Sequence, residues 1–357
     1  MEFNFRIELG KMTPKIAEGA KIYIFGAGAH WESICKIYKY LVNINIDDYI
    51  DGFIDNDQNK QRTLFHNKPV YALVDIDVEN SVILISVITG GSIHSISWQL
   101  LNAGMLHRHS FFTPGCFMTI LLRWEYLRLM QFKNKHKGQR CFIIGNGPSL
   151  ASGDLDQLKS ELTFATNKIY LLFNKTEWRP SYYVIADDVI IKNIHTEIEE
   201  KITCPKFYAY NTVFDIENFM MTDGYFYYLD GRADLKPEPF SIPAFSEEPF
   251  MLQWGATVTY DCIQLAAYMG FDEIYLLGVD HSFPLAIKNN GEIIQKKVGG
   301  HFSPIYGETI YNAQIDISNA AYKTARAYAE QHDIKIYNAT RGGELKIFEH
   351  VNFDKLF

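Results

Sequence analysis

A glycine-rich segment at residues 141–150, Cys-Phe-Ile-Ile-Gly-Asn-Gly-Pro-Ser-Leu, has the residue types and spacing of a phosphate-binding turn. An apolar strand runs directly into the turn, and a helix follows it. Gly145 and Gly147 allow backbone angles that other residues avoid, and Ser149 and Ser152 can cap the helix. Amide groups at a helix N-terminus attract anions without a lysine. The segment is neither a Walker loop nor a complete Gly-x-Gly-x-x-Gly fingerprint, so a nucleotide site and a tight structural turn both stay open.

Polar side chains also stand at the ends of other apolar segments, at Asn167, Asp187 and Asp280. Ligands of open parallel sheets gather beyond the carboxyl ends of the strands, so we expect these residues to face a common site. If their strands are neighbours, Asp187 and Asp280 could share a magnesium ion. Asp187 and Asp188 do not form an Asp-x-Asp metal motif, because neighbours in a strand point to opposite faces. No histidine or cysteine cluster has the spacing of a zinc site, and no metal ligands are predicted.

The elements that must hold these residues alternate between apolar strands and amphipathic helices, which predicts parallel sheets. A chain of 357 residues exceeds the usual size of one domain, and 47% hydrophobic residues are enough for two cores. We expect an α/β fold with two Rossmann-like parallel-sheet domains joined by a helix. The N-terminal domain would cover residues 1–115, the linker helix residues 116–138 and the second domain residues 139–357.

Charge and composition restrict the partners and the location of the protein. The formal net charge of −8 and a pI of about 5.8 argue against a nucleic-acid partner, which requires a basic face. The first residues lack the pattern of a secretory signal, and no apolar run reaches the length of a membrane span, so we expect a cytoplasmic location. The cysteines are scattered without a Cys-x-x-Cys pair and are expected to be reduced thiols: Cys35, Cys116, Cys141, Cys204 and Cys262.

Residues 116–138 begin apolar and end basic. This pattern predicts an interdomain helix with a solvated basic tail. The alternative is a surface helix that meets anionic lipid, with Trp124 and Phe132 at the interface, which would hold the protein peripherally at the inner face of a membrane. Formation of a homo-oligomer stays open.

Residues 20–110 contain an apolar strand, the turn Gly26-Ala-Gly28 and a later Gly-Phe-Ile-Asp-Asn segment. They resemble the N-terminal Rossmann-like domain of the sugar O-acyltransferases that act on nucleotide-sugars. Trp31 stands in place of the third glycine of a dinucleotide fingerprint, where its bulk would crowd a pyrophosphate. We therefore expect either a scaffold or dimerisation domain, or a sugar or nucleotide pocket that uses Gly26, Gly28 and Asp55.

The second domain carries several motifs in a fixed order. They are Ile-Gly-Asn-Gly-Pro-Ser-Leu at 144–150, Thr-Asn at 166–167, Pro-Ser-Tyr-Tyr-Val-Ile-Ala-Asp at 180–187, Gly-Phe-Asp-Glu-Ile-Tyr-Leu-Leu-Gly-Val-Asp at 270–280, and Asn-Ala-Thr-Arg-Gly-Gly at 338–343. In this order they resemble the hydroxymethylpterin-pyrophosphokinase-like (MptE-like) family, which includes the central domain of the motility-associated flagellin glycosyltransferases. The same skeleton is similar to the small bacterial sialyltransferases that use CMP-activated sialic acid. The resemblance covers about residues 139–350 and implies a sialyltransferase-like modified Rossmann domain, a variant of the GT-A fold.

The resemblance implies a nucleotide-sugar site in this domain. Its nucleotide-binding residues would be Gly145, Asn146, Gly147, Pro148, Ser149, Asn167, Asp187, Thr257 and Asp280. Asp187 stands where the sialyltransferases carry an asparagine. A carboxylate there suits ribose hydroxyls or the amino group of cytosine, but it repels phosphate unless a cation intervenes. Thr257 keeps the hydroxyl of a serine that contacts the nucleotide in the sialyltransferases.

The resemblance also implies catalytic residues. His301 stands where the sialyltransferases place their catalytic histidine. Because the pKa of histidine lies near the working pH, His301 is the candidate general base for the acceptor hydroxyl; the alternative is an ordinary loop histidine. His281 is the second candidate base. Tyr306 or Tyr311 could hydrogen-bond the leaving phosphate.

Together these features favour an inverting glycosyltransferase of polysaccharide biosynthesis. It would move a nonulosonic acid, such as sialic, legionaminic or pseudaminic acid, from a CMP donor to a glycan or glycoprotein acceptor. No cofactor is expected, because amide and hydroxyl groups can neutralise a single donor phosphate. One alternative is a magnesium-dependent pyrophosphokinase, which would clamp a triphosphate with basic groups such as Lys168, Lys175 and Arg341. The other is a non-catalytic subunit that binds nucleotide-sugars.

Overall fold

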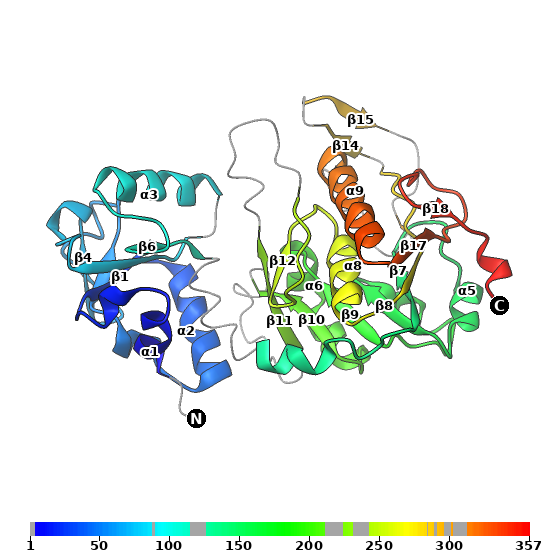
Figure 1. Ribbon diagram of the computed structural model, residues 1–357, viewed down its shortest axis with the longest axis horizontal. Coiled ribbons are helices and arrows are strands. Elements are labelled where there is room, and N and C mark those ends of the chain that lie inside the picture. Colours follow the sequence, from blue (N-terminus) through cyan, green and yellow to red (C-terminus); the bar gives the residue numbers. More distant parts are fainter. Residues whose placement is uncertain are drawn as a thin grey trace. The chain divides into compact units, whose positions relative to one another are not determined.

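The computed structural model describes residues 4–87, 90–114, 126–210, 224–230, 243–283, 285–288, 291–295, 301–302 and 313–357. The described residues form two compact units, one up to Leu127 and the other from Arg128 onward (Figure 1). The predicted domain boundary at residue 115 and the linker helix up to residue 125 lie outside the described residues. Residues 126–129 are helical and lead into a 3-10 turn, η4 (Met130–Phe132).

The first unit is built on a six-stranded sheet with the strand order β3-β4-β2-β1-β5-β6. Neighbouring strands pair in parallel except β3 and β4, which form an antiparallel hairpin. The strands are β1 (Lys21–Phe25), β2 (Gly52–Ile54), β3 (Leu64–Phe65), β4 (Lys68–Tyr71), β5 (Ser81–Ile85) and β6 (Phe111–Phe112). The helices are α1 (Phe5–Gly10), α2 (Ala29–Val42) and α3 (Gly90–Asn102), with 3-10 turns η1 (Pro14–Ile16), η2 (Ile46–Tyr49) and η3 (Leu73–Asp75).

Strand β1 occupies the centre of this sheet, between β2 and β5. Ile22 and Ile24 on it are fully buried, as expected for a parallel strand covered on both faces. Trp31 on α2 is fully buried as well, and its ring lies 5.8 Å from that of Phe53 on β2. The bulk of Trp31 therefore fills the core between α2 and the sheet.

The second unit contains a nine-stranded sheet with the order β12-β11-β10-β9-β8-β7-β13-β17-β18, in which every neighbouring pair is parallel. A small sheet, β15-β14-β16, accompanies it. The strands are β7 (Arg140–Ile144), β8 (Leu162–Thr166), β9 (Tyr182–Ile185), β10 (Lys206–Ala209), β11 (Gly224–Asp230), β12 (Met251–Gln253), β13 (Glu273–Leu277), β14 (Leu285–Ile287), β15 (Ile293–Gln295), β16 (Ala313–Gln314), β17 (Lys335–Asn338) and β18 (Glu349–His350). The helices are α5 (Ser152–Gln157), α6 (Asp188–Lys201), α8 (Val258–Tyr268) and α9 (Ile315–Gln331), with 3-10 turns η5 (Ile169–Leu172) and η8 (Phe353–Lys355).

The core of this unit lies between the sheet and α8. Cys262, Leu265 and Met269 are completely buried, as their helical spacing predicts, and they join the apolar side chains of β7 and β13 in one cluster. Two largely parallel sheets with accompanying helices confirm the predicted α/β class with two Rossmann-like domains.

The structure corrects one part of the lipid-binding alternative. Phe132 is only 2% exposed, and its ring packs against those of Tyr182, Phe207 and Tyr225 in the second unit. It is therefore a core residue of that unit rather than an interfacial anchor, because burial removes it from any lipid surface. Trp124 lies outside the described residues. Among the helices that are described, none combines the length and the hydrophobicity needed to cross a bilayer.

Candidate functional site

The glycine segment leaves the carboxyl end of β7, with β8 on one side and β13 on the other. From β7 the chain builds the sheet outward through β8, β9, β10, β11 and β12, and only then crosses back to add β13 on the opposite side. In open α/β sheets, the crevice at such a switch point is where ligands bind. The residues that follow β7 and β13 therefore meet at the favoured position for a site.

Gly145 and Gly147 are required by the close approach of the chain that follows β13. A side chain at Gly145 would place its Cβ 2.4 Å from the carbonyl oxygen of Gly278, and one at Gly147 would place it 1.8 Å from a carboxylate oxygen of Asp280. Neither glycine has a positive φ. The expectation that they are needed for unusual backbone angles is wrong, since the absence of a Cβ is what the packing demands.

The amide groups of the turn are used within the protein. Gly145 donates its N–H to the carbonyl oxygen of Leu277 at 2.8 Å, and Gly147 donates to that of Gly278 at 2.9 Å. These two amide groups bond the turn to the end of β13, so they are not available to bind a phosphate of a ligand.

The predicted helix capping is also wrong. Helix α5 spans only Ser152–Gln157, and its N-cap is Ala151, with no side-chain cap. Ser149 instead donates its hydroxyl to Asp280 Oδ2 at 2.8 Å, and its N–H lies 3.4 Å from the same oxygen. A carboxylate is a stronger hydrogen-bond acceptor than a neutral oxygen, which explains why Ser149 bonds to Asp280 and does not cap the helix.

Asp280 thus supplies a negative group to the turn itself. Its side chain is buried, which raises the pKa of the carboxyl, while the two hydrogen bonds from Ser149 lower it. A carboxylate here suits a hydroxyl or amino group of a ligand and would repel a phosphate laid directly against it.

His301 reaches the same turn from a distant part of the chain. The N–H of the next residue, Phe302, donates to the carbonyl oxygen of Asn146 at 3.1 Å. Burial lowers the pKa of His301, nearby Lys168 lowers it further, and a hydrogen bond with the Asn146 backbone raises it. The imidazole is consequently neutral at neutral pH, the form in which it can accept a proton.

Two asparagines at the site have buried side-chain oxygen atoms that could accept hydrogen bonds from a ligand. Asn146 donates its Nδ2 to the backbone oxygen of Thr166 at 3.1 Å and to its hydroxyl at 2.9 Å, which orients the amide. Asn167 follows β8 with φ of 49°. Within the described part of the chain, the Oδ1 atoms of both asparagines are buried without a hydrogen-bond partner. Because such an atom costs about 1–3 kcal/mol, both positions favour a ligand that donates hydrogen bonds.

Asp187 and Thr257 serve as helix caps. Asp187 accepts the N–H of Ile190 at 2.8 Å at the start of α6, and burial raises the pKa of its carboxyl. Thr257 caps α8, where its hydroxyl accepts the N–H of Thr259 at 3.4 Å. The capping hydrogen bonds explain the positions of both side chains without a bound ligand. A nucleotide contact from either residue therefore stays a prediction.

Strand order separates the two acids that could have shared magnesium. Asp187 follows β9 and Asp280 follows β13, with β8 and β7 between them. Three strand spacings amount to about 14 Å, too far for a common ion. The expectation is therefore wrong, because it required adjacent strands.

The remaining predicted groups are placed as follows. His281 is buried at φ of 52° and hydrogen-bonds Asn319 Oδ1 at 2.9 Å. Arg341 is held by the carboxylates of Asp154 and Asp354. Lys175 is exposed. Pro148 is exposed at the tip of the turn, and Tyr306 and Tyr311 lie outside the described residues.

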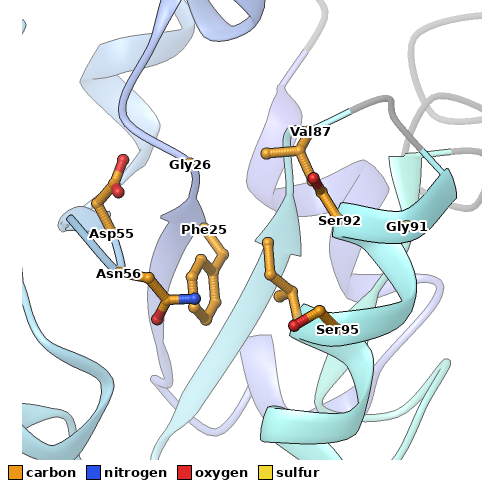
Figure 2. A pocket seen from close by; sticks show the side chains of 9 residues that line it. Phe25, Gly26, Asp55, Asn56, Val87, Gly91, Ser92 and Ser95 are labelled. Atoms are coloured by element: carbon orange, nitrogen blue, oxygen red, sulfur yellow. The ribbon is translucent and has the colours of Figure 1, made fainter.

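The first unit has a cavity of its own, of about 290 Å³, at the carboxyl ends of β1, β2 and β5. In Figure 2, Asp55 and Asn56 lie on one side of it and Ser92 and Ser95 of α3 on the other. Its lining consists of Phe25, Gly26, Asp55, Asn56, Val87, Gly91, Ser92, Ser95 and Ile96.

The turn beside this cavity is held by polar contacts. Asp55 accepts the N–H of Ala27 at 3.0 Å and the ammonium of Lys60 at 3.1 Å, and Gly26 has φ of +116°. Trp31 does not line the cavity, so it does not crowd a ligand there. This geometry supports the pocket alternative for Gly26 and Asp55, whereas Gly28 is the N-cap of α2 and is not part of the lining.

Comparison with known proteins finds a family match over the middle of the chain. Residues 124–285 match the model of the family described as 6-hydroxymethylpterin diphosphokinase MptE-like. No curated protein matches the chain. Among solved structures, the chain is similar to a MAf glycosyltransferase from Magnetospirillum magneticum AMB-1, with 14% identity and a TM-score of 0.41 over 99% of this chain and 62% of that one. The chain therefore spans about three fifths of the length of that protein. Of the candidate site, the family match includes the glycine turn and Asp280 but ends before His301.

Proposed function

We propose that this protein is a glycosyltransferase acting on a nucleotide-sugar donor, from the MptE-like match over residues 124–285 and from the histidine, His301, that lies beside the glycine turn of that region. The donor would be a CMP-activated nonulosonic acid, and the acceptor a hydroxyl of a glycan or glycoprotein. The observation that carries the proposal is the position of His301, a half-buried histidine with a lowered pKa that contacts the backbone of Asn146 in the glycine turn. A neutral imidazole beside the turn at the switch point of the sheet suits a general base.

The reaction would be a single displacement with inversion. His301 accepts the proton of the acceptor hydroxyl as its oxygen attacks the anomeric carbon of the sugar. The bond from that carbon to the phosphate oxygen breaks, and its electron pair leaves with CMP. The imidazole becomes imidazolium and releases its proton to solvent after CMP has left.

The polar atoms around the turn suit the nucleoside part of the donor. The Oδ1 atoms of Asn146 and Asn167 can accept hydrogen bonds from ribose hydroxyls or the cytosine amino group. The carboxylate of Asp280 likewise favours groups that donate hydrogen bonds. Since two amides of the turn are already paired with β13, a donor with one phosphate fits this site better than one with a long phosphate chain.

A magnesium-dependent pyrophosphokinase is the second candidate, and the name of the matched family, 6-hydroxymethylpterin diphosphokinase MptE-like, favours it. Such an enzyme would be expected to clamp a triphosphate with basic side chains. Arg341 is occupied by two carboxylates, and Lys175 is exposed, which leaves Lys168 as the predicted clamp beside His301. These contacts support the transferase over the kinase. A non-catalytic nucleotide-sugar-binding subunit is the third candidate.

The test is sugar transfer from a panel of CMP-, UDP- and GDP-sugars by the intact protein and its His301→Ala variant. We expect turnover with a CMP-sugar to fall by about 100-fold or more in the variant, because general-base catalysis contributes about that much, while CMP affinity is retained. His332→Gln is the matched control, since His332 is an exposed histidine at the end of α9. Unchanged turnover in His301→Ala would show that His301 is not the general base. Formation of a diphosphate product from ATP would favour the kinase.

A further inference from the structure

Three side chains in the first unit converge on one point outside both sites described above. Cys35 lies on α2, Asp47 in η2, and His66 in the turn between β3 and β4. The Sγ of Cys35 is 3.8 and 3.9 Å from the two carboxylate oxygens of Asp47 and 4.0 Å from Nδ1 of His66. Nδ1 of His66 is 2.8 Å from Asp47 Oδ2. A thiol, an imidazole and a carboxylate therefore each present one atom to a common space.

The spacing of these atoms is close to that of a tetrahedral transition-metal site. Zinc bonds to sulfur, nitrogen and oxygen imply edges of about 3.6 Å between S and N and about 3.4 Å between N and O. On ion binding, the distances from Cys35 Sγ to His66 Nδ1 and to the Asp47 carboxylate need to shorten by a few tenths of an ångström. The distance between His66 Nδ1 and Asp47 Oδ2 needs to lengthen by about 0.6 Å, and their direct hydrogen bond is then replaced by bonds to the ion.

A catalytic Cys-His-Asp triad is excluded by the same geometry. In a triad, the nucleophile and the carboxylate engage opposite nitrogens of the imidazole, so that a proton can pass through the ring. Here both Cys35 and Asp47 face Nδ1 of His66. All three groups point inward, as ligands do.

Trp31 holds one of the three side chains, Asp47, in place by a hydrogen bond. Its indole N–H donates to Asp47 Oδ1 at 2.8 Å, while the ring is fully buried against Phe53. An outer hydrogen bond of this kind fixes the orientation of a ligating carboxylate. This arrangement gives a role to the tryptophan that replaces glycine in the sequence.

The cluster is accessible from solvent. The side chain of His66 is 24% exposed and that of Asp47 is 15% exposed, so an ion can enter and keep a position open for water or another ligand.

We propose that Cys35, Asp47 and His66 form a site for a divalent ion of the zinc class, with three protein ligands and one open position. The donor set of sulfur, nitrogen and oxygen suits zinc and its neighbours rather than magnesium or calcium. The site does not depend on the proposed transferase activity, because it lies wholly within the first unit.

The experiment is metal titration of the reduced, chelator-treated full-length protein with Zn²⁺ and Co²⁺. We expect one equivalent of Zn²⁺ to bind with a Kd of about 1 μM or tighter, and bound Co²⁺ to show a thiolate-to-cobalt charge-transfer band. No stoichiometric binding, or a cobalt complex without that band, would overturn the proposal.

The variants assign the ligands. Cys35→Ser should weaken Zn²⁺ binding by more than about 100-fold and abolish the cobalt band, and Trp31→Phe should weaken binding by about 10-fold. Cys204→Ser is the matched control, because Cys204 is a partly exposed cysteine of the second unit, and it should leave both readouts unchanged. Since Cys35→Ser could simply unfold the first unit, His66→Gln, in the two-residue turn between β3 and β4, serves as the second ligand variant. Retained stoichiometric binding in a folded His66→Gln protein would contradict the assignment.

Discussion

His301 and Asp280 reach the glycine turn from separate segments and bring opposite properties to it. Asp280 is a buried acceptor held by Ser149, and His301 is an imidazole whose lowered pKa keeps it neutral. A base that removes a proton from the acceptor hydroxyl serves glycosyl transfer directly, and a buried hydrogen-bond acceptor can orient hydroxyl or amino groups of the ligand. At the scale of residues, the site is therefore consistent with acid–base chemistry.

The pH dependence of turnover follows from the pKa of His301. Burial and Lys168 lower this pKa below its ordinary value of 6.5, and a general base acts only when it is unprotonated. We expect kcat/KM to be constant near pH 7 and to fall as the pH drops through the pKa of His301, with the midpoint below 6.5. The measurement is kcat/KM for a CMP-sugar between about pH 4.5 and 8. A midpoint above that ordinary value would show that another group limits the rate.

At the scale of elements, the turn after β7 is shaped by its packing against the end of β13. The N–H groups of Gly145 and Gly147 bond to the carbonyl oxygens of Leu277 and Gly278 at the end of β13, and no room remains for a Cβ at either glycine. Helix α5 is too short and too poorly capped to act as an anion site by itself. The glycines thus fix the position of Asp280 relative to the turn rather than exposing amides to a ligand.

Substitution of Gly147 tests this interpretation. In Gly147→Ala the new methyl group would lie 1.8 Å from Asp280 Oδ2 and 2.7 Å from the carbonyl oxygen of Gly278. We expect the free energy of unfolding to fall by about 1–3 kcal/mol, because overpacking forces the turn and β13 apart.

The control for this prediction is Gly153→Ala. Gly153 lies within α5, and a Cβ there would have no neighbour within 4 Å. Because alanine is the better helix former, this variant should be unchanged or more stable by up to about 1 kcal/mol. The measurement is urea unfolding monitored by circular dichroism, and equal stability of the two variants would contradict the packing argument.

At the scale of the whole molecule, each unit has its own largely parallel sheet, its own apolar core and its own candidate binding site. The core of the first unit gathers side chains such as Phe25, Ile83 and Leu100, whereas that of the second joins β7, β13 and α8. Independent cores predict that a ligand of one unit stabilises that unit in particular.

Differential scanning calorimetry can check this prediction. We expect Zn²⁺ to raise the melting temperature of one transition and a CMP nucleotide to raise that of another, because each ligand binds a different unit. The Cys35→Ser and Asn146→Ala variants should each lose one of these shifts and keep the other. A single transition that responds equally to both ligands would show that the units unfold together.

The sequence alone was sufficient for the α/β class, for the apolar strands and for the family motifs of the second unit. Strands β1 and β7 are recognisable because burial on both faces demands a local run of apolar residues. The strands depend on neighbours in the chain, and a local pattern can report them. The glycine turn is recognisable as a motif, but the reason for its glycines is the close approach of Gly278 and Asp280 from a distant segment.

Only the tertiary structure decided which residues meet. Strand order is not written in any local pattern, and it separates Asp187 from Asp280 while it brings Asp280 beside Ser149. Cys35, Asp47 and His66 come from a helix, a 3-10 turn and a hairpin, at spacings that no metal-binding motif describes. Their convergence depends on how α2 and the hairpin pack on the sheet, and packing between distant segments is determined by the fold as a whole.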